Sequence, residues 1–141
     1  MLMLVNNGYS QYKENSVNTA TPEELTLMLY NGLVKFIMQA QSAIAAKNIE
    51  KAHEGILRAQ AIVTEFLATL DMDYEISDSL DSIYTYMIKR LVQANLSKDV
   101  AILEEVLGYA KDMRDTWAQA MKLAKQTTTT PATEGIAKYD K

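Results

Sequence analysis

Apolar residues recur every three to four positions along most of the chain, which is the spacing of a helix with one buried face. The pattern predicts a first helix from Thr21 to about Lys47. Its start combines Thr21 as a cap, Pro22 at the first helical position and Glu24 in a capping box. One face of this helix carries Leu25, Met28, Leu29, Gly32, Phe36 and Ala40.

The same period continues through a second and a third helix. Asn48 is placed to cap the second, whose apolar stripe occupies residues 49–70. Residues 71–77 are polar and predict a connection. The third helix carries its stripe over residues 80–94 and is interrupted at residues 95–97.

A fourth helix follows this interruption. Ser97 is placed to cap it, its stripe extends over residues 100–121, and the pattern fades by Lys125. Short connections between long amphipathic helices make neighbours antiparallel. The expected fold is therefore all-α: an antiparallel up-down four-helix bundle over residues 21–125, without a sheet.

The first helix has more apolar surface than one bundle seam requires. Leu27, Tyr30, Val34 and Met38 lie roughly opposite the face described above when the helix is drawn at 100° per residue. One interpretation is that the helix sits deep and packs on two neighbours. The other is that this second face forms a docking groove for a helix of another protein. The two interpretations are compatible.

Both ends of the chain differ from the middle. Residues 1–20 contain Met1–Val5, Tyr9, Tyr12 and Val17, which are too apolar for a solvated arm. They predict either a short helix packed permanently on the bundle or a detachable N-terminal cap over a binding groove. Residues 126–141 are Thr-rich without an apolar period and predict a disordered, flexible tail.

Composition and charge narrow the class of protein. The 141 residues are 48% hydrophobic and 23% charged, which suits one globular domain. A net charge of −4 argues against a nucleic-acid partner. No stretch approaches the ~20 apolar residues of a membrane span, and the apolar start is too short for a secretion signal. We expect a cytoplasmic protein that does not insert into membranes.

Little in the sequence supports catalysis. The chain has no Cys and a single His, so thiol chemistry and a metal site built on several His are excluded. Glu50 and His53 have the spacing of a di-iron helix motif, but a second such pair is missing. A histidine phosphotransfer bundle using His53 stays open as the alternative function. We expect no enzyme activity, no metal and no cofactor.

Several motifs together resemble a known family. Tyr9 and Tyr12, the run Val17–Leu25 and the block Leu27–Gly32 closely resemble the flagellin secretion chaperones of bacteria, the FliS family. The later run Leu80–Leu91 fits the same family. The resemblance covers most of the chain, and the Tyr pair combined with the two blocks makes it specific.

The resemblance implies a non-catalytic export chaperone of the bacterial cytosol. Such a protein binds the C-terminal helical segment of flagellin, prevents premature polymerisation and assists delivery to the export gate protein of the flagellar type III system. Whether a flagellar assembly regulator also binds is left open. By position, Tyr9 and Tyr12 match the family's cap and gate contacts. The candidates on the first helix come from the helical wheel and not from the resemblance. The full set of candidate partner-binding residues is Tyr9, Tyr12, Val17, Leu27, Tyr30, Val34 and Met38.

Overall fold

The computed structural model describes residues 19–129, and this part of the chain forms helices and contains no strand. The helices are α2 (Pro22–Ala45), α3 (Ile49–Ala68), α4 (Ile76–Ser97) and α5 (Val100–Thr129). The all-α four-helix fold expected from the sequence is therefore confirmed. The expected N-terminal cap segment, apart from its last two residues, and most of the expected tail lie outside the described residues.

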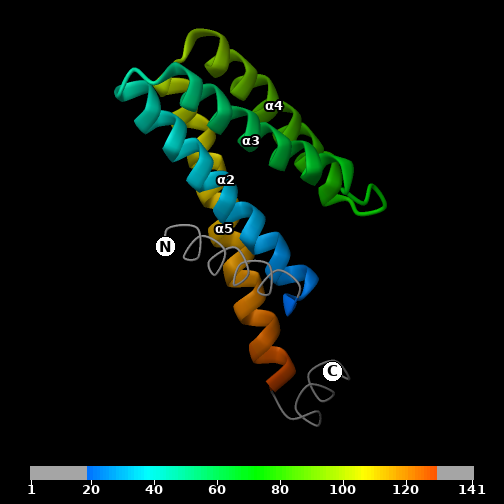
Figure 1. The fold of residues 1–141 in the computed structure, drawn as a ribbon. Helices are drawn as coiled ribbons and strands as arrows, with labels where there is room; N and C mark the ends of the chain where they lie inside the picture. The colour runs from blue at the N-terminus through cyan, green and yellow to red at the C-terminus, as the bar shows by residue number, and fades with distance from the viewer. Residues whose placement is uncertain (1–18, 130–141) are drawn as a thin grey trace, which may run out of the picture.

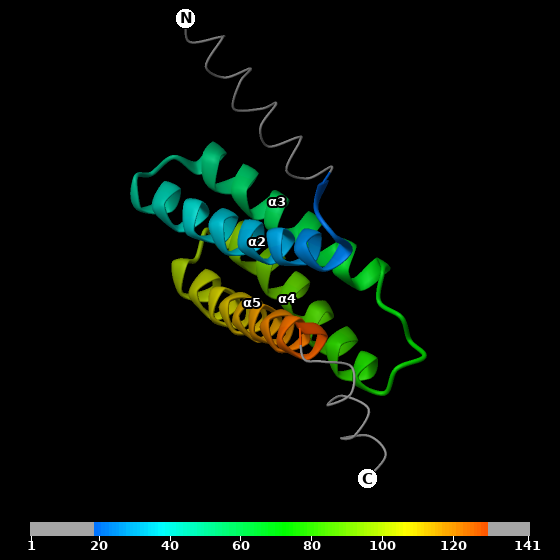
Figure 2. The same ribbon diagram turned by 90° about the horizontal axis from the view of Figure 1, so that it is seen from below.

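The four helices form a closed, antiparallel ring (Figures 1 and 2). α2 packs against α3 and α5, and α4 packs against the same two helices from the other side. α2 and α4 therefore lie across the bundle from each other. The C-terminal part of α5 extends beyond the other three helices (Figure 1). At 1.5 Å per residue, its 30 residues span about 45 Å.

Two of the predicted helix caps are confirmed. The Thr21 hydroxyl accepts a hydrogen bond from the backbone N–H of Glu24 at 3.1 Å, and Pro22 is the first residue of α2. The Asn48 side chain accepts a hydrogen bond from the backbone N–H of Lys51 at 3.1 Å. Each bond satisfies an amide that the first turn of a helix leaves without an intrahelical partner.

The prediction that Ser97 caps the last helix was wrong. Ser97 is the final residue of α4, and its hydroxyl donates to the carbonyl oxygen of Gln93 at 3.2 Å. The cap is Asp99, whose carboxylate accepts from the backbone N–H groups of Ala101 at 2.9 Å and Ile102 at 3.3 Å. An ionised Asp also interacts favourably with the positive end of the helix dipole.

The last helix is also longer than expected, since it continues to Thr129 and does not fade at Lys125. The chain has no Gly or Pro between Gly108 and Pro131, so no residue in that interval breaks the helix. The apolar period ends earlier than the helix because the extension has fewer neighbours to pack against.

The core lies along the axis of the ring, where side chains from all four helices meet. Its largest fully buried members are Leu33, Ile37, Ile56, Val63, Met87, Leu91, Leu103 and Val106. α2 and α3 approach closely at Gly55, where an added Cβ atom would lie 3.1 Å from the carbonyl oxygen of Phe36. The glycine therefore permits this close helix packing.

Candidate partner-binding surface

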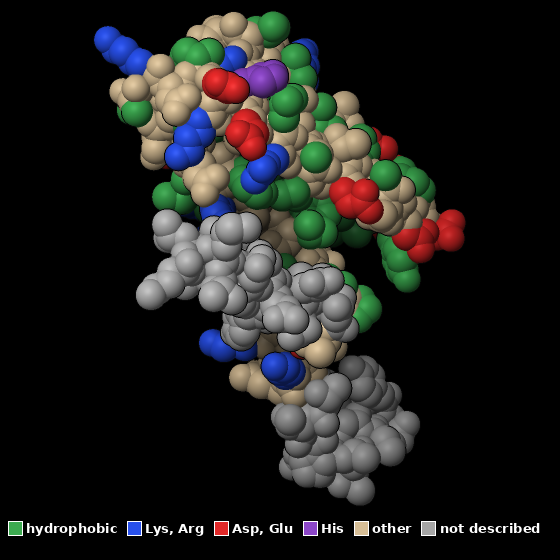
Figure 3. All heavy atoms as spheres, viewed as in Figure 1, with side chains coloured by type: hydrophobic (Ala, Val, Ile, Leu, Met, Phe, Trp, Pro, Cys, Tyr) green, Lys and Arg blue, Asp and Glu red, His purple; other side chains and the backbone are tan. Residues whose placement is uncertain are grey.

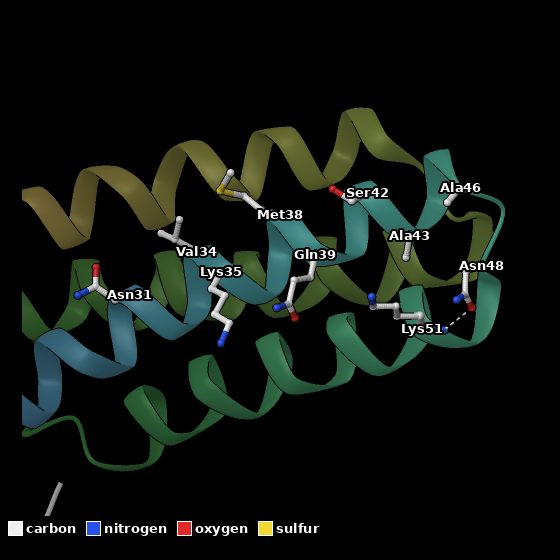
Figure 4. Close-up of a pocket in the computed structure, with 10 residues that line it drawn as sticks. All are labelled: Asn31, Val34, Lys35, Met38, Gln39, Ser42, Ala43, Ala46, Asn48 and Lys51. Atoms are coloured by element: carbon white, nitrogen blue, oxygen red, sulfur yellow. Dashed lines mark hydrogen bonds between the residues drawn. The ribbon is translucent and has the colours of Figure 1, made fainter. Parts of the chain in front are cut away.

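An open groove of about 590 Å³ follows the C-terminal half of α2 and reaches the start of α3 (Figure 4). Val34 and Met38 point to the α5 side of α2, whereas Lys35, Gln39 and Lys51 lie on the α3 side. The groove is lined by Asn31, Val34, Lys35, Met38, Gln39, Ser42, Ala43, Ala46, Asn48 and Lys51. A surface with an apolar edge and a polar edge suits an amphipathic helix.

A second hollow, of about 600 Å³, lies at the opposite end of the bundle, where the N-terminal half of α2 meets the α3–α4 connection and α5. Four aromatic side chains line it: Tyr30, Phe66, Tyr84 and Trp117. The ring centroids of Tyr30 and Phe66 are 4.5 Å apart, and those of Phe66 and Tyr84 are 5.7 Å apart. Asp71 and Asp112 add acidic groups to the otherwise largely apolar wall.

Hydrogen bonds hold this aromatic wall in place. The hydroxyl groups of Tyr30 and Tyr84 lie 3.1 Å apart, and the indole N–H of Trp117 donates to the carbonyl oxygen of Glu23 at 3.0 Å. Burial, aided by the hydrogen bond to Tyr30, raises the pKa of Tyr84 well above its ordinary value. The polar ends of these large side chains are therefore satisfied within the protein, which leaves their apolar faces available to the hollow.

The structure divides the four residues that the sequence placed on the second apolar face of α2. Met38 is 48% exposed and Leu27 is partly buried, but Tyr30 and Val34 are only 7% and 5% exposed and belong to the core. Conversely, Met28 was expected in the core and is 39% exposed. Because α2 packs on both α3 and α5, its buried arc is centred between these two helices and differs from the face that the helical wheel selected.

Two of these four residues nevertheless line the groove, and a third lines the hollow. Val34 and Met38 are on the groove, and Tyr30 is in the wall of the hollow. The remaining candidates, Tyr9, Tyr12 and Val17, lie outside the described residues. Phe66, Tyr84 and Trp117 were identified in the sequence only as parts of apolar stripes. Two features of the sequence could have indicated the hollow: these three side chains are large, and each lies near one end of its stripe.

One family model with the description flagellar protein FliS matches residues 5–124, which includes all four helices except the end of α5. The chain belongs to the FliS family. The flagellar secretion chaperone FliS of Bacillus subtilis is 49% identical over 120 residues, covering 85% of this chain and 90% of the relative. That of Salmonella typhimurium is 33% identical, covering 79% and 86%. That of Campylobacter jejuni is 31% identical, covering 81% and 91%.

These FliS relatives carry the name of a chaperone and none is named as an enzyme, which fits a non-enzymatic role. Their names refer to the flagellum and to secretion. Residues 19–129 include no helix that is both long and apolar enough to cross a membrane. Membership of the FliS family thus confirms the family that the sequence motifs indicated.

The single histidine of this FliS-family chain is at the surface and bonded to a neighbouring helix. His53 on α3 is exposed, and its Nδ1 atom lies 2.9 Å from the amide nitrogen of Asn95 on α4. The Lys98 ammonium donates to the carbonyl and side-chain oxygens of Asn95 at 2.6 and 2.7 Å. Within residues 19–129, no three His, Asp or Glu side chains are grouped so that they could hold a metal ion. His53 therefore belongs to a polar contact between α3 and α4.

Proposed function

We propose that this protein is a cytosolic export chaperone that binds the C-terminal helical segment of flagellin. By covering that segment it keeps flagellin from polymerising before export. It also assists delivery of flagellin to the export gate protein of the flagellar type III apparatus. Membership of the FliS family and the names of the relatives support this proposal.

The observation that carries the proposal is the open groove along α2, whose apolar edge is formed by the exposed Met38 and the largely buried Val34. Filament subunits that polymerise through helical segments must bury apolar faces against one another. A free segment of this kind would self-associate unless another apolar surface covered it. Ordering the segment on the chaperone costs several kcal/mol, which offsets part of the favourable free energy of the contacts. The complex therefore stays reversible, as export requires.

Met38 allows a direct test because it is exposed and its replacement should leave the core intact. We expect Met38→Asp to weaken binding of the flagellin C-terminal segment about tenfold or more, measured by calorimetry, because a charge would face the apolar side of that segment. Met72→Asp is the matched control. Met72 is 52% exposed and lies in the α3–α4 connection at the other end of the bundle, outside the groove.

Circular dichroism should give the same helical content for both variants, so that a loss of binding cannot be attributed to unfolding. Equal affinities of the two variants would show that the partner does not use the α2 groove. Absence of any complex with the unsubstituted protein at micromolar concentration would contradict the proposed function itself. Tyr30→Asp is unsuitable as a test because Tyr30 is part of the core.

A further inference from the structure

The groove along α2 has cationic groups on one edge only. Lys35 on α2 and Lys51 on α3 both line it, and both lie on the α3 side of α2 (Figure 4). The opposite edge, formed by Val34 and Met38, is apolar. No Asp or Glu lines the groove. The two edges therefore differ in charge as well as in polarity.

The two lysines have no anionic partner within residues 19–129. Neither ammonium group forms an ion pair there, although Arg58, Arg90 and Arg114 each have one. Lys35 instead lies over the ring of Phe36, 5.9 Å from its centroid. Both lysine side chains are exposed, so their charges are available to a bound partner.

Acidic residues are unevenly distributed along the chain relative to the two lysines of the groove. Although the chain has a net charge of −4, it has no acidic residue between Glu24 and Glu50. Acidic residues concentrate instead at the far end of α3 and the start of α4, at positions 71, 73, 75, 78 and 81. Figure 3 shows acidic side chains gathered over the α3–α4 connection, whereas near the start of α3 acidic and basic side chains lie side by side. Glu50 and Glu54 flank Lys51 on α3, and Glu54 forms an ion pair with Arg58. The residues that line the groove itself nevertheless carry two positive charges and no negative charge.

We propose that the groove selects an amphipathic helix of the partner whose edge facing α3 carries Asp or Glu side chains. The apolar stripe of that helix would cover Val34 and Met38, while its acidic edge would face Lys35 and Lys51. This arrangement fixes which way the helix is rotated about its axis, because the opposite rotation buries acidic groups against the apolar edge. The inference rests on the proposed function and specifies the chemistry of the flagellin segment that fits the groove.

Charge reversal at the two lysines tests the proposal. We expect Lys35→Glu and Lys51→Glu each to weaken binding of the flagellin C-terminal segment by about three- to tenfold in calorimetry, with a larger loss in the double variant. Lys89→Glu is the matched control, since Lys89 is an exposed lysine on α4 that does not line the groove. This control should change the affinity less than about twofold.

Salt and a charge-swapped partner separate a charge effect from a loss of packing. Raising the salt concentration from about 0.1 M to about 1 M shortens the Debye length from about 10 Å to about 3 Å. It should therefore weaken the unsubstituted complex and have less effect on the double variant. A flagellin segment with Lys in place of its Asp and Glu residues should bind the double variant more tightly than the unsubstituted protein.

The outcomes distinguish this inference from the proposed function. If the unsubstituted protein binds the segment but all lysine variants bind equally well, the inference is overturned and the chaperone function stands. The same conclusion follows if the charge-swapped segment shows no preference for the double variant. If the unsubstituted protein does not bind the natural segment, both the function and the inference are overturned.

Discussion

The hydroxyl groups of Tyr30 and Tyr84 lie 3.1 Å apart and join α2 to α4 across the bundle. These two helices lie on opposite sides of the ring, and each packs mainly on α3 and α5. Both tyrosines are buried, so each hydroxyl depends on the other for its hydrogen bond within the protein. The same pair forms part of the aromatic wall of the second hollow. A polar contact thus fixes the shape of an otherwise apolar region.

Removing one of the two hydroxyl groups should therefore cost more stability than half of the loss caused by removing both. We expect Tyr30→Phe and Tyr84→Phe each to lower the free energy of unfolding by about 1–2 kcal/mol, because each leaves one buried hydroxyl without its partner. The double variant should lose less than the sum of the two, with a coupling of about 1 kcal/mol. Urea unfolding of the four proteins measures this coupling. Additive losses would mean that the two hydroxyls act independently.

The raised pKa of Tyr84 predicts a loss of stability in alkali. Below the ordinary tyrosine pKa of about 10, the folded and unfolded chains both keep this proton. Above it, the unfolded chain releases the proton while the folded chain retains it, so unfolding becomes easier as the pH rises. The slope is about 1.4 kcal/mol per pH unit for one such group.

Tyr84→Phe should remove that contribution. Between about pH 10 and 11, we expect its free energy of unfolding to fall less steeply than that of the unsubstituted protein, by about 1 kcal/mol over this pH unit, because the unfolded tyrosine is only partly ionised at pH 10. Urea unfolding at several pH values supplies the measurement, and Tyr109→Phe, at a tyrosine 38% exposed, is a suitable control. Identical alkaline slopes for the Tyr84 variant and the unsubstituted protein would contradict the raised pKa.

The helices could be predicted from the sequence because local signals agreed with the apolar period. Thr21, Pro22 and Asn48 mark two helix starts by chemistry that depends only on neighbouring residues. The start of α5 was less predictable, since Ser97 and Asp99 are both good capping residues only two positions apart. The choice depends on where α4 ends, and Lys98 in the left-handed region, with φ of 54°, sets that end.

The two candidate caps at this junction can be compared directly. We expect Asp99→Ala to lower the free energy of unfolding by about 1 kcal/mol, because two backbone N–H groups of α5 lose their acceptor. Ser97→Ala should change it by less than about 0.5 kcal/mol, since the hydroxyl only donates to a carbonyl within α4. Thermal or urea unfolding gives both values. A larger loss for Ser97→Ala would reverse the assignment of the cap.

The candidate site was harder to predict from the sequence than the helices were. A helical wheel correctly showed that α2 has more apolar residues than one seam needs, but it could not show where α3 and α5 would sit around them. Val34 and Met28 illustrate this, since Val34, a candidate for the docking face, is buried, and Met28, on the face assigned to the core, is exposed. The cationic edge was missed for a related reason: Lys35 and Lys51 lie on different helices and come together only through packing.

Two glycines in helices should respond in opposite ways to the same substitution. Gly108 on α5 is exposed and an added Cβ atom would meet nothing within 4 Å, so Gly108→Ala should raise the free energy of unfolding by about 0.5–1 kcal/mol through helix propensity alone. At Gly55, the added atom would lie 3.1 Å from the carbonyl oxygen of Phe36 and 3.3 Å from the Cβ atom of Ala40. That carbonyl can move only if α2 moves away from α3, which loosens a tightly packed interface. Gly55→Ala should therefore be less stable than Gly108→Ala by about 1 kcal/mol or more, measured by urea unfolding. Equal stabilisation by the two substitutions would mean that α2 and α3 can separate slightly at little energetic cost.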